Sequence, residues 1–314
     1  MIKVSVVVIT YNFEKYILET LNSIKNQTYK NIELIISDDN SNDNTKFIVE
    51  KWIEKNREEF REIIFFKNSI NQGVTKNINI GVRRSTGEWV KIIAGDDILE
   101  KNAISNYIES IKNNKLINIV FGQAQSFNDT FNKSNFGKVL PAKDEEKFFF
   151  KTIEQQKKWL LKGNPIPAPT SFIRRKLLEK NNYFDERFKM VEDYPFWFKI
   201  VNQGEKIYFL KKITVFYRKI STSVSAKKSG EEISKAMFEF DKSFYYEELS
   251  KNSKNILYKW DKKIEFLIKN LIMKNNNKKL PFYKKRALNL LFFKNLLIIL
   301  LVIAGYFIYK QLVS

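Results

Sequence analysis

Two aspartate pairs, each placed where a strand-like apolar run stops, constrain the fold of this chain more than any other feature. Residues 32–36 lead into Asp38–Asp39, and residues 89–93 lead into Asp96–Asp97. Apolar runs of this length are typical of strands buried in a parallel sheet. Because ligand-binding groups gather at the carboxyl ends of such strands, both pairs are predicted to lie at one edge of the sheet.

Strand-like and helix-like segments alternate over the first hundred residues. Strands are predicted at 4–10, 32–36, 63–66 and 89–93. The helices between them are predicted over about 16–27 and 46–60, with a third that opens at Asn71-Gln72-Gly73 and ends at Gly87. This order predicts an α/β fold whose sheet is mostly parallel and has helices on both faces. The apolar N-terminus is expected to be a strand and not a signal peptide.

Beyond residue 100 the pattern loosens. Short strands are predicted at 117–121 and 215–218, and Pro195 suits the first turn of a helix. The passage 163–170 carries three prolines, so it is expected to be rigid, non-helical and suited to the wall of a cleft. From residue 226 a basic segment with helical periodicity follows.

The composition excludes several chemistries. The chain of 314 residues has neither Cys nor His, which rules out disulfides, thiolate or imidazole zinc sites and His-dependent triads. Acid–base chemistry must use Asp, Glu, Lys or Tyr, and a metal must be a hard cation held by oxygen. The net charge of +20 comes mostly from Lys spread along the chain, so we expect no nucleic-acid partner. A basic face is equally compatible with an anionic lipid surface.

The C-terminal part carries an unbroken apolar run at 296–309. As a helix this run is about 21 Å long, short of the roughly 30 Å hydrocarbon core, and extension back to residue 287 would reach the needed length. The basic cluster at 284–286 then predicts a large domain on the cytoplasmic face of the cell membrane, anchored peripherally or by a single span. A buried or interfacial helix is the alternative.

Each acidic motif also has a purely structural interpretation. Asp38–Asp39 alone is compatible with an Asx turn before a helix, and Asp96–Asp97 with a surface turn. Asp193 stands two residues before Pro195, a spacing that is also typical of a helix N-cap. The convergence of two pairs at one sheet edge favours a functional site, because unrelated turns have no reason to gather there.

The motifs resemble those of the family 2 glycosyltransferases, which have a GT-A type fold. The resemblance covers roughly residues 2 to 220 in the family's order and spacing. The matching segments are Val4–Asn12, Ser37–Thr45, Asn71–Gly73 with Asn79–Gly81, Gly87–Asp97 and Glu192–Asp193.

This resemblance implies a role for each motif. Residues Thr10, Tyr11 and Asp39 would line the base pocket, with Asp39 accepting a hydrogen bond from uracil. Asp97 would be the ligand of Mg²⁺ or Mn²⁺ on the diphosphate, and Asp193 would be the general base of an inverting, hexosyltransferase-type reaction. Further donor-site residues on the same motifs would be Asn12, Asn71, Gly73 and Asp96.

The resemblance also implies a division of labour along the chain. Residues 1–100 would bind a nucleotide-sugar donor, and the expected donor is a UDP-sugar. Residues 101–225 would form the acceptor-binding and catalytic half of the same domain. Residues 226–286 would form a basic helical extension, followed by the hydrophobic helix at 287–310. The acceptor would be a glycan or a lipid-linked glycan of surface-polysaccharide synthesis.

The chain departs from the family pattern at three positions. Ala94 replaces the first Asp of the family's DxD region, Ile78 replaces a common Arg, and Ile220 replaces a common His. Four cations are candidates to compensate, and the sequence does not choose among them: Lys76, Arg83, Arg218 and Lys219.

Two other functions remain open at this point. A nucleotidyltransferase would use similar aspartates, but the residues after the first strand, 10–13, lack the Gly- and Lys-rich phosphate loop common in such enzymes. The second alternative is a non-catalytic nucleotide-sugar-binding protein with the same fold.

Overall fold

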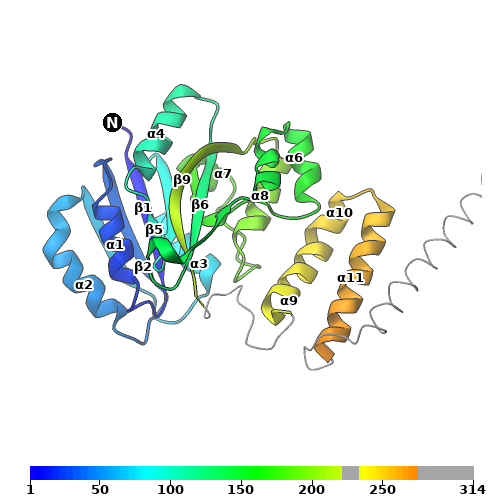
Figure 1. Ribbon diagram of the computed structural model, residues 1–314, viewed down its shortest axis with the longest axis horizontal. Helices are drawn as coiled ribbons and strands as arrows, with labels where there is room; N and C mark the ends of the chain where they lie inside the picture. The colour runs from blue at the N-terminus through cyan, green and yellow to red at the C-terminus, as the bar shows by residue number, and fades with distance from the viewer. Residues whose placement is uncertain (221–232, 275–314) are drawn as a thin grey trace, which may run out of the picture. The chain divides into compact units, whose positions relative to one another are not determined.

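The computed structural model describes residues 1–220 and 233–274 (Figure 1). The chain divides into two compact units, Met1–Ile220 and Ser221–Ser314. All residues of the predicted site belong to the first unit, and each unit is described by itself below.

Four parallel strands begin the sheet, in the order β3-β2-β1-β4. Their bounds are β1 (Val4–Thr10), β2 (Ile32–Asp38), β3 (Glu62–Lys67) and β4 (Trp89–Ala94). The helices between them are α1 (Ile17–Lys25), α2 (Thr45–Asn56) and α3 (Val74–Arg83), with a 3₁₀ turn η1 (Arg57–Glu59). The predicted parallel sheet and its three helices are confirmed for this half, although α3 ends at Arg83, four residues before Gly87.

The alternation of side chains along β1 decides which helix covers which face. Val6 and Val8 share the main core cluster with Leu21 of α1. The intervening Val7 points to the other face, where its side chain approaches Gly81 of α3 so closely that a Cβ there would lie 2.6 Å away. Successive side chains of a strand point to opposite faces, so α1 and α3 cover the two sides of the sheet, as expected.

The rest of the sheet is mixed, which corrects the expectation of a mostly parallel sheet throughout. Beyond β4 the order is β8-β6-β9-β5, with β7 paired to β6; β4–β8, β6–β8, β6–β7 and β5–β9 are antiparallel, and only β6–β9 is parallel. The bounds are β5 (Ile98–Leu99), β6 (Ile119–Asn128), β7 (Phe136–Leu140), β8 (Ser171–Arg174) and β9 (Tyr208–Lys219).

Strands β6 and β9 extend farther than the sequence pattern predicted, because both contain polar residues. The predicted strand 117–121 continues to Asn128 through Gln123, Gln125 and Ser126. The predicted strand 215–218 begins at Tyr208 and contains the exposed pair Lys211–Lys212. Such residues interrupt an apolar run without breaking the backbone pairing that defines a strand.

The remaining helices of the first unit are short: α4 (Ala103–Asn113), α5 (Lys143–Glu146), α6 (Ile153–Leu160), α7 (Arg175–Lys180) and α8 (Asp193–Asn202). The second unit is helical over its described part, with α9 (Lys235–Phe244), α10 (Ser250–Asn252) and α11 (Ile256–Lys274). Single turns are η2 (Lys133–Asn135), η3 (Lys147–Phe150), η4 (Ala168–Thr170) and η5 (Tyr245–Leu249), so the passage 163–170 ends in one 3₁₀ turn.

Within residues 1–220 and 233–274, no helix is long and apolar enough to cross a membrane. The hydrophobic helix predicted at 287–310 lies outside the described residues, as does the last part of the basic extension.

A buried carboxylate fixes the amino-terminal ends of the parallel strands. The side chain of Glu33 is 1% exposed and contacts the hydroxyl of Ser5, the ammonium of Lys3 and the backbone N–H of Thr86, the last at 2.5 Å. Burial raises the pKa of Glu33, but the contacts with Lys3, Ser5 and Thr86 outweigh it and lower the pKa to about 2. This cluster lies at the end of the sheet opposite to the aspartate pairs.

We expect Glu33→Gln to lower the free energy of unfolding by roughly 1–3 kcal/mol at pH 7, because charged hydrogen bonds in a buried site are lost. Glu33 has a lowered pKa in the folded protein, so its contribution is present above the ordinary pKa and is lost as the pH falls toward 2. Urea unfolding of both proteins from pH 7 to pH 3 measures this. A stability difference that does not shrink in acid would contradict the assignment.

Candidate active site

The carboxylate of Asp39 holds the loop that precedes α3. It accepts hydrogen bonds from the side chain of Asn68 at 2.9 Å and from the backbone N–H groups of Gln72 and Gly73, both at 2.8 Å. Gly73 has φ +84°, a conformation that favours glycine, and it lets the chain turn into α3 at this point. A carboxylate offers about four acceptor positions, so one remains on Asp39 for a ligand.

Thr10 and Asp38 lie side by side beneath this loop. They are paired in register at the ends of β1 and β2, and the backbone N–H of Asp39 donates to the Thr10 carbonyl at 2.9 Å. The Thr10 hydroxyl and one carboxylate oxygen of Asp38 are buried without a hydrogen-bond partner. Burial raises the pKa of Asp38, against the opposing effect of the Ser41 backbone N–H. Unpaired buried oxygens at a sheet edge are groups that a ligand can satisfy.

The loop after β1 is joined to the loop after β2. The Asn12 backbone N–H donates to the Ser41 hydroxyl at 2.9 Å, and the Asn42 N–H donates to the Asn12 side-chain oxygen at 2.8 Å. Asn12 has φ +55°, which asparagine tolerates better than most residues. Tyr11, which is 41% exposed, precedes Asn12 in this loop. The structure therefore brings Thr10, Tyr11 and Asn12 together with Asp39, as the resemblance implies.

Asp96 and Asp97 occupy a turn at the carboxyl end of β4. One oxygen of Asp97 accepts the Arg218 backbone N–H at 2.9 Å, and its other oxygen accepts no hydrogen bond from the described residues. The carboxylate of Asp96 accepts no hydrogen bond from another described residue, and Asp96 is 8% exposed. Burial raises the pKa of Asp96 to about 6; burial, followed by the charge of Asp96, raises the pKa of Asp97.

These carboxylates fit a hard divalent cation. Two buried acidic groups with raised pKa values and free oxygens are stabilised by a positive charge between them. No cluster of three acidic side chains that would hold a metal occurs among the described residues. Asp96 and Asp97 would therefore share the cation with oxygen ligands from the donor diphosphate or water. Asp96 is the more accessible of the two.

Asp193 is the first residue of α8, and its carboxylate is not used as a helix cap. The cap position belongs to Glu192, whose side chain makes no capping hydrogen bond. The side-chain amide of Asn164 donates to Asp193 Oδ2 at 2.8 Å. Burial raises the pKa of Asp193, while hydrogen bonds from the Tyr194 backbone and from Asn164 lower it. Burial and the neighbouring Asp193 raise the pKa of Glu192 to about 8.

The segment before Asp193 is hydrogen-bonded to α3, which follows the loop that Asp39 holds. The Thr75 backbone N–H donates to the Lys189 carbonyl at 3.2 Å, and the Thr75 hydroxyl donates to the Phe188 carbonyl. Farther along α3, the side chain of Asn79 donates to the Phe184 carbonyl at 2.8 Å. These contacts connect α3, which begins directly after the loop that Asp39 holds, with the segment 184–189 that precedes Asp193. Asn71 lies in this loop, with its side chain turned back onto the Gly73 N–H at 3.2 Å.

Two residues in these contacts were missed or left undecided by the sequence. Asn164 follows Gly163 in a passage notable only for its prolines, and no local signal points to a partner 29 positions away. Arg218 was one of four candidate cations, and only the long return of β9 beside the Asp96–Asp97 turn distinguishes it.

The chain is similar to known glycosyltransferases. A family model described as Glycosyl transferase family 2 matches residues 5–181. A glycosyltransferase of Methanocaldococcus jannaschii, MJ1057, which is itself uncharacterized, is 32% identical over 216 residues, 68% of this chain and 70% of the relative. The GalNAc(5)-diNAcBac-PP-undecaprenol beta-1,3-glucosyltransferase of Campylobacter jejuni is 31% identical over 216 residues, covering 69% of this chain and 64% of that enzyme.

Solved structures agree with this class. The crystal structure of S. aureus TarS 1-349 in complex with UDP-GlcNAc has a TM-score of 0.57 at 25% identity, over 77% of this chain and 66% of that chain. The protein is therefore a glycosyltransferase with an α/β fold of the GT-A type. It belongs to glycosyltransferase family 2. This membership excludes the nucleotidyltransferase alternative and supports an enzyme over a non-catalytic protein with the same fold.

We expect Asn164→Ala to lower kcat about tenfold, a part of the 10²–10⁴-fold that a positioned base contributes. The Asn164 hydrogen bond lowers the pKa of Asp193, so its loss raises that pKa and moves the acid limb of the kcat/KM profile to higher pH. Asn118→Ala is the matched control, because it removes an Asn–carboxylate contact of 2.9 Å to Glu205, a residue outside the assembled site. Equal pH profiles for all three proteins would contradict this role.

Proposed function

We propose that the protein transfers a sugar from a nucleotide donor, a UDP-sugar in the first instance, to a hydroxyl of a glycan or lipid-linked acceptor with inversion at the anomeric carbon. The observation that carries the proposal is the carboxylate of Asp193, which is held by Asn164 at 2.8 Å and has a raised pKa. A carboxylate of raised pKa is a stronger base toward an acceptor hydroxyl than an ordinary one.

The base acts in a single displacement. Asp193 takes the proton of the acceptor hydroxyl as that oxygen attacks the anomeric carbon, and the bond from this carbon to the diphosphate oxygen breaks. Asn164 holds Oδ2 of this carboxylate, so we assign the transfer of the proton to Oδ1. A single displacement inverts the anomeric configuration, and it needs no second carboxylate as nucleophile.

The donor would bind along the edge formed by Thr10, Asp39, Gly73 and the Asp96–Asp97 turn. The remaining acceptor position of Asp39 and the unpaired Thr10 hydroxyl suit the polar edge of a base, and Tyr11 offers an exposed ring beside them. UDP is chosen because the S. aureus TarS structure that this chain resembles is described as a complex with UDP-GlcNAc.

Asp96 and Asp97 would hold Mg²⁺ or Mn²⁺ against the donor diphosphate. When bound, the cation neutralises the negative charge that develops on the leaving diphosphate. Asp97 keeps its position through the Arg218 backbone N–H, and Asp96 offers both oxygens.

The acceptor class follows from relatives. The Campylobacter jejuni relative is named for a substrate linked to undecaprenol by a diphosphate, and the Escherichia coli relative WfaP, 29% identical over 227 residues, is named for GlcNAc-diphosphoundecaprenol. A lipid-linked acceptor is exposed at a membrane. We therefore propose the cytoplasmic face of the cell membrane as the location, supported by the apolar run at 296–309 and the basic residues 284–286.

Replacing Asp193 with Asn is expected to lower transfer by about 10²–10⁴-fold and to leave UDP binding unchanged, because the amide keeps the shape and loses the basicity. Transfer is measured as UDP release with an undecaprenyl-diphosphate-linked sugar, and NMR of the product reports the anomeric configuration. A product with retained configuration, or full activity of the variant, would contradict the mechanism.

Donor selection is tested by calorimetric titration of UDP, GDP, CDP and dTDP with and without Mn²⁺, repeated in Asp39→Ala, Asp96→Ala and Asp97→Ala. We expect UDP to bind most tightly of the four, to bind more tightly with Mn²⁺ than without it, and to bind more weakly to all three variants. Equal binding of the four nucleotides would remove UDP from the proposal.

A further inference from the structure

Arg218 is a buried arginine beside the Asp96–Asp97 turn. Its side chain is 1% exposed, although it stands at the end of β9 in the acceptor half of the unit. A buried guanidinium is costly unless its N–H groups and its charge are compensated, so each of its partners identifies a group that the fold holds in place through this residue.

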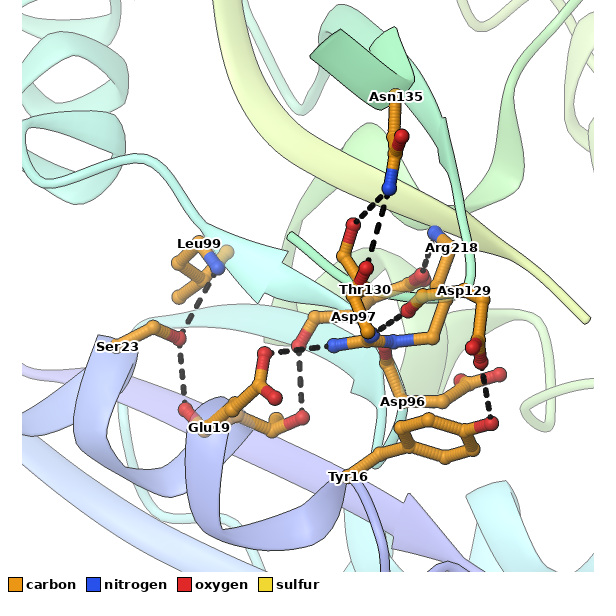
Figure 2. A network of polar contacts seen from close by, with 11 residues as sticks. Tyr16, Glu19, Ser23, Asp96, Asp97, Leu99, Asp129, Thr130, Asn135 and Arg218 are labelled. Atoms are coloured by element: carbon orange, nitrogen blue, oxygen red, sulfur yellow. Dashed lines mark hydrogen bonds and ion pairs between the residues drawn. The ribbon is translucent and has the colours of Figure 1, made fainter. Parts of the chain in front are cut away.

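The guanidinium joins three segments (Figure 2). Arg218 Nε donates to the Asp96 carbonyl at 2.7 Å, Nη1 donates to the Asp129 carbonyl, and Nη2 donates to Glu19 of α1 at 2.8 Å. In addition, the Arg218 backbone N–H donates to the carboxylate of Asp97 at 2.9 Å. Arg218 is thus hydrogen-bonded to both aspartates of the turn: to the backbone carbonyl of Asp96 and to the side-chain carboxylate of Asp97.

Aromatic rings enclose the same guanidinium. Its carbon lies 4.5 Å from the ring centroid of Tyr16 and 4.8 Å from that of Phe127. The Tyr16 hydroxyl in turn donates to the carboxylate of Asp129 at 3.0 Å. These contacts fix the plane of the guanidinium and with it the direction of its hydrogen bonds.

The other candidate cations have different surroundings. Arg83 faces Glu186 at 3.8 Å and the ring of Tyr183, and Lys76 and Lys219 are exposed. Lys91 is buried near Asp97, but its ammonium donates to the Ile92 and Pro169 carbonyls, and burial lowers its pKa to about 7. Among these described cations, Arg218 is the one whose N–H groups bond to the Asp96–Asp97 turn itself.

We propose that Arg218 is a positioning residue of the donor site, which holds the Asp96–Asp97 turn in the geometry that a divalent cation on the donor diphosphate requires. This inference rests on the proposed function. The fork of the guanidinium is needed because the Asp96 carbonyl and the Asp129 carbonyl are reached from different nitrogens. A lysine has one nitrogen on a flexible stem and cannot keep both contacts together with Glu19.

The experiment compares wild type, Arg218→Lys and Glu19→Gln by titration of Mn²⁺ in the presence of saturating UDP, followed by electron paramagnetic resonance. Residues that orient metal ligands typically change metal affinity by about 10–100-fold when replaced, and we expect a loss in this range for Arg218→Lys. Glu19→Gln removes the charge of the half-exposed partner, but the amide oxygen of Gln can still accept the hydrogen bond from Nη2 and the contacts with Asp96 and Asp129 remain, so we expect a change of less than about threefold.

Glu33→Gln separates positioning from general destabilisation. It disturbs a buried polar cluster at the opposite end of the same sheet, so it is expected to lower the unfolding midpoint and to leave Mn²⁺ affinity unchanged. UDP affinity without Mn²⁺ serves as a second readout and should be the same in Arg218→Lys and wild type.

Three outcomes would overturn a claim. Unchanged Mn²⁺ affinity in folded Arg218→Lys would overturn the positioning role. Equal losses of affinity in Arg218→Lys and Glu33→Gln would reduce Arg218 to a stabilising residue. Absence of UDP-dependent Mn²⁺ binding by wild type would instead overturn the metal in the proposed function, which is a distinguishable result.

Discussion

The register of three parallel strands is the constraint on which the site depends. In β1, Thr10 pairs with Asp38 of β2 while the neighbouring Ile9 pairs with Ala94 of β4. Because the strands are parallel and in this register, the turns that follow them start at the same level of the sheet. A shift of one residue in either pairing would turn the side chains of the shifted strand to the other face. The positions of Thr10, Asp39 and the Asp96–Asp97 turn therefore follow from backbone pairing set in the interior of the sheet.

The first half of the fold was predictable because its signals are local. The runs that became β1, β2 and β4 are mainly apolar on both faces, and the helices between them repeat apolar residues at helical spacing, as Ile17, Leu21 and Ile24 do in α1. The second half was not, since β6 and β9 contain polar residues and pair with partners far away in the sequence. Pairing of that kind is decided by tertiary contacts that no local pattern records.

The candidate site divides in the same way. Thr10, Asp39 and Asp96–Asp97 stand at strand ends, so their place followed from the strands themselves. Whether an acidic side chain supports the backbone or faces a ligand depended on partners that the sequence did not reveal. Asp39 uses most of its acceptor capacity on its own loop, and Asp193 lies one position inside α8, where the side chain of Asn164 holds its carboxylate. The aspartates that attract attention in the sequence are thus partly structural.

The contacts around Gly73 bear on the order in which substrates would bind. The loop at Gly73 is held by Asp39, and Thr75, two residues later, holds the Phe188–Lys189 segment that leads to Asp193. In the proposed function, nucleotide and acceptor would therefore not meet two independent surfaces. Tightening of this loop around a nucleobase would also move the segment that leads to Asp193, so we expect the donor to bind before the acceptor.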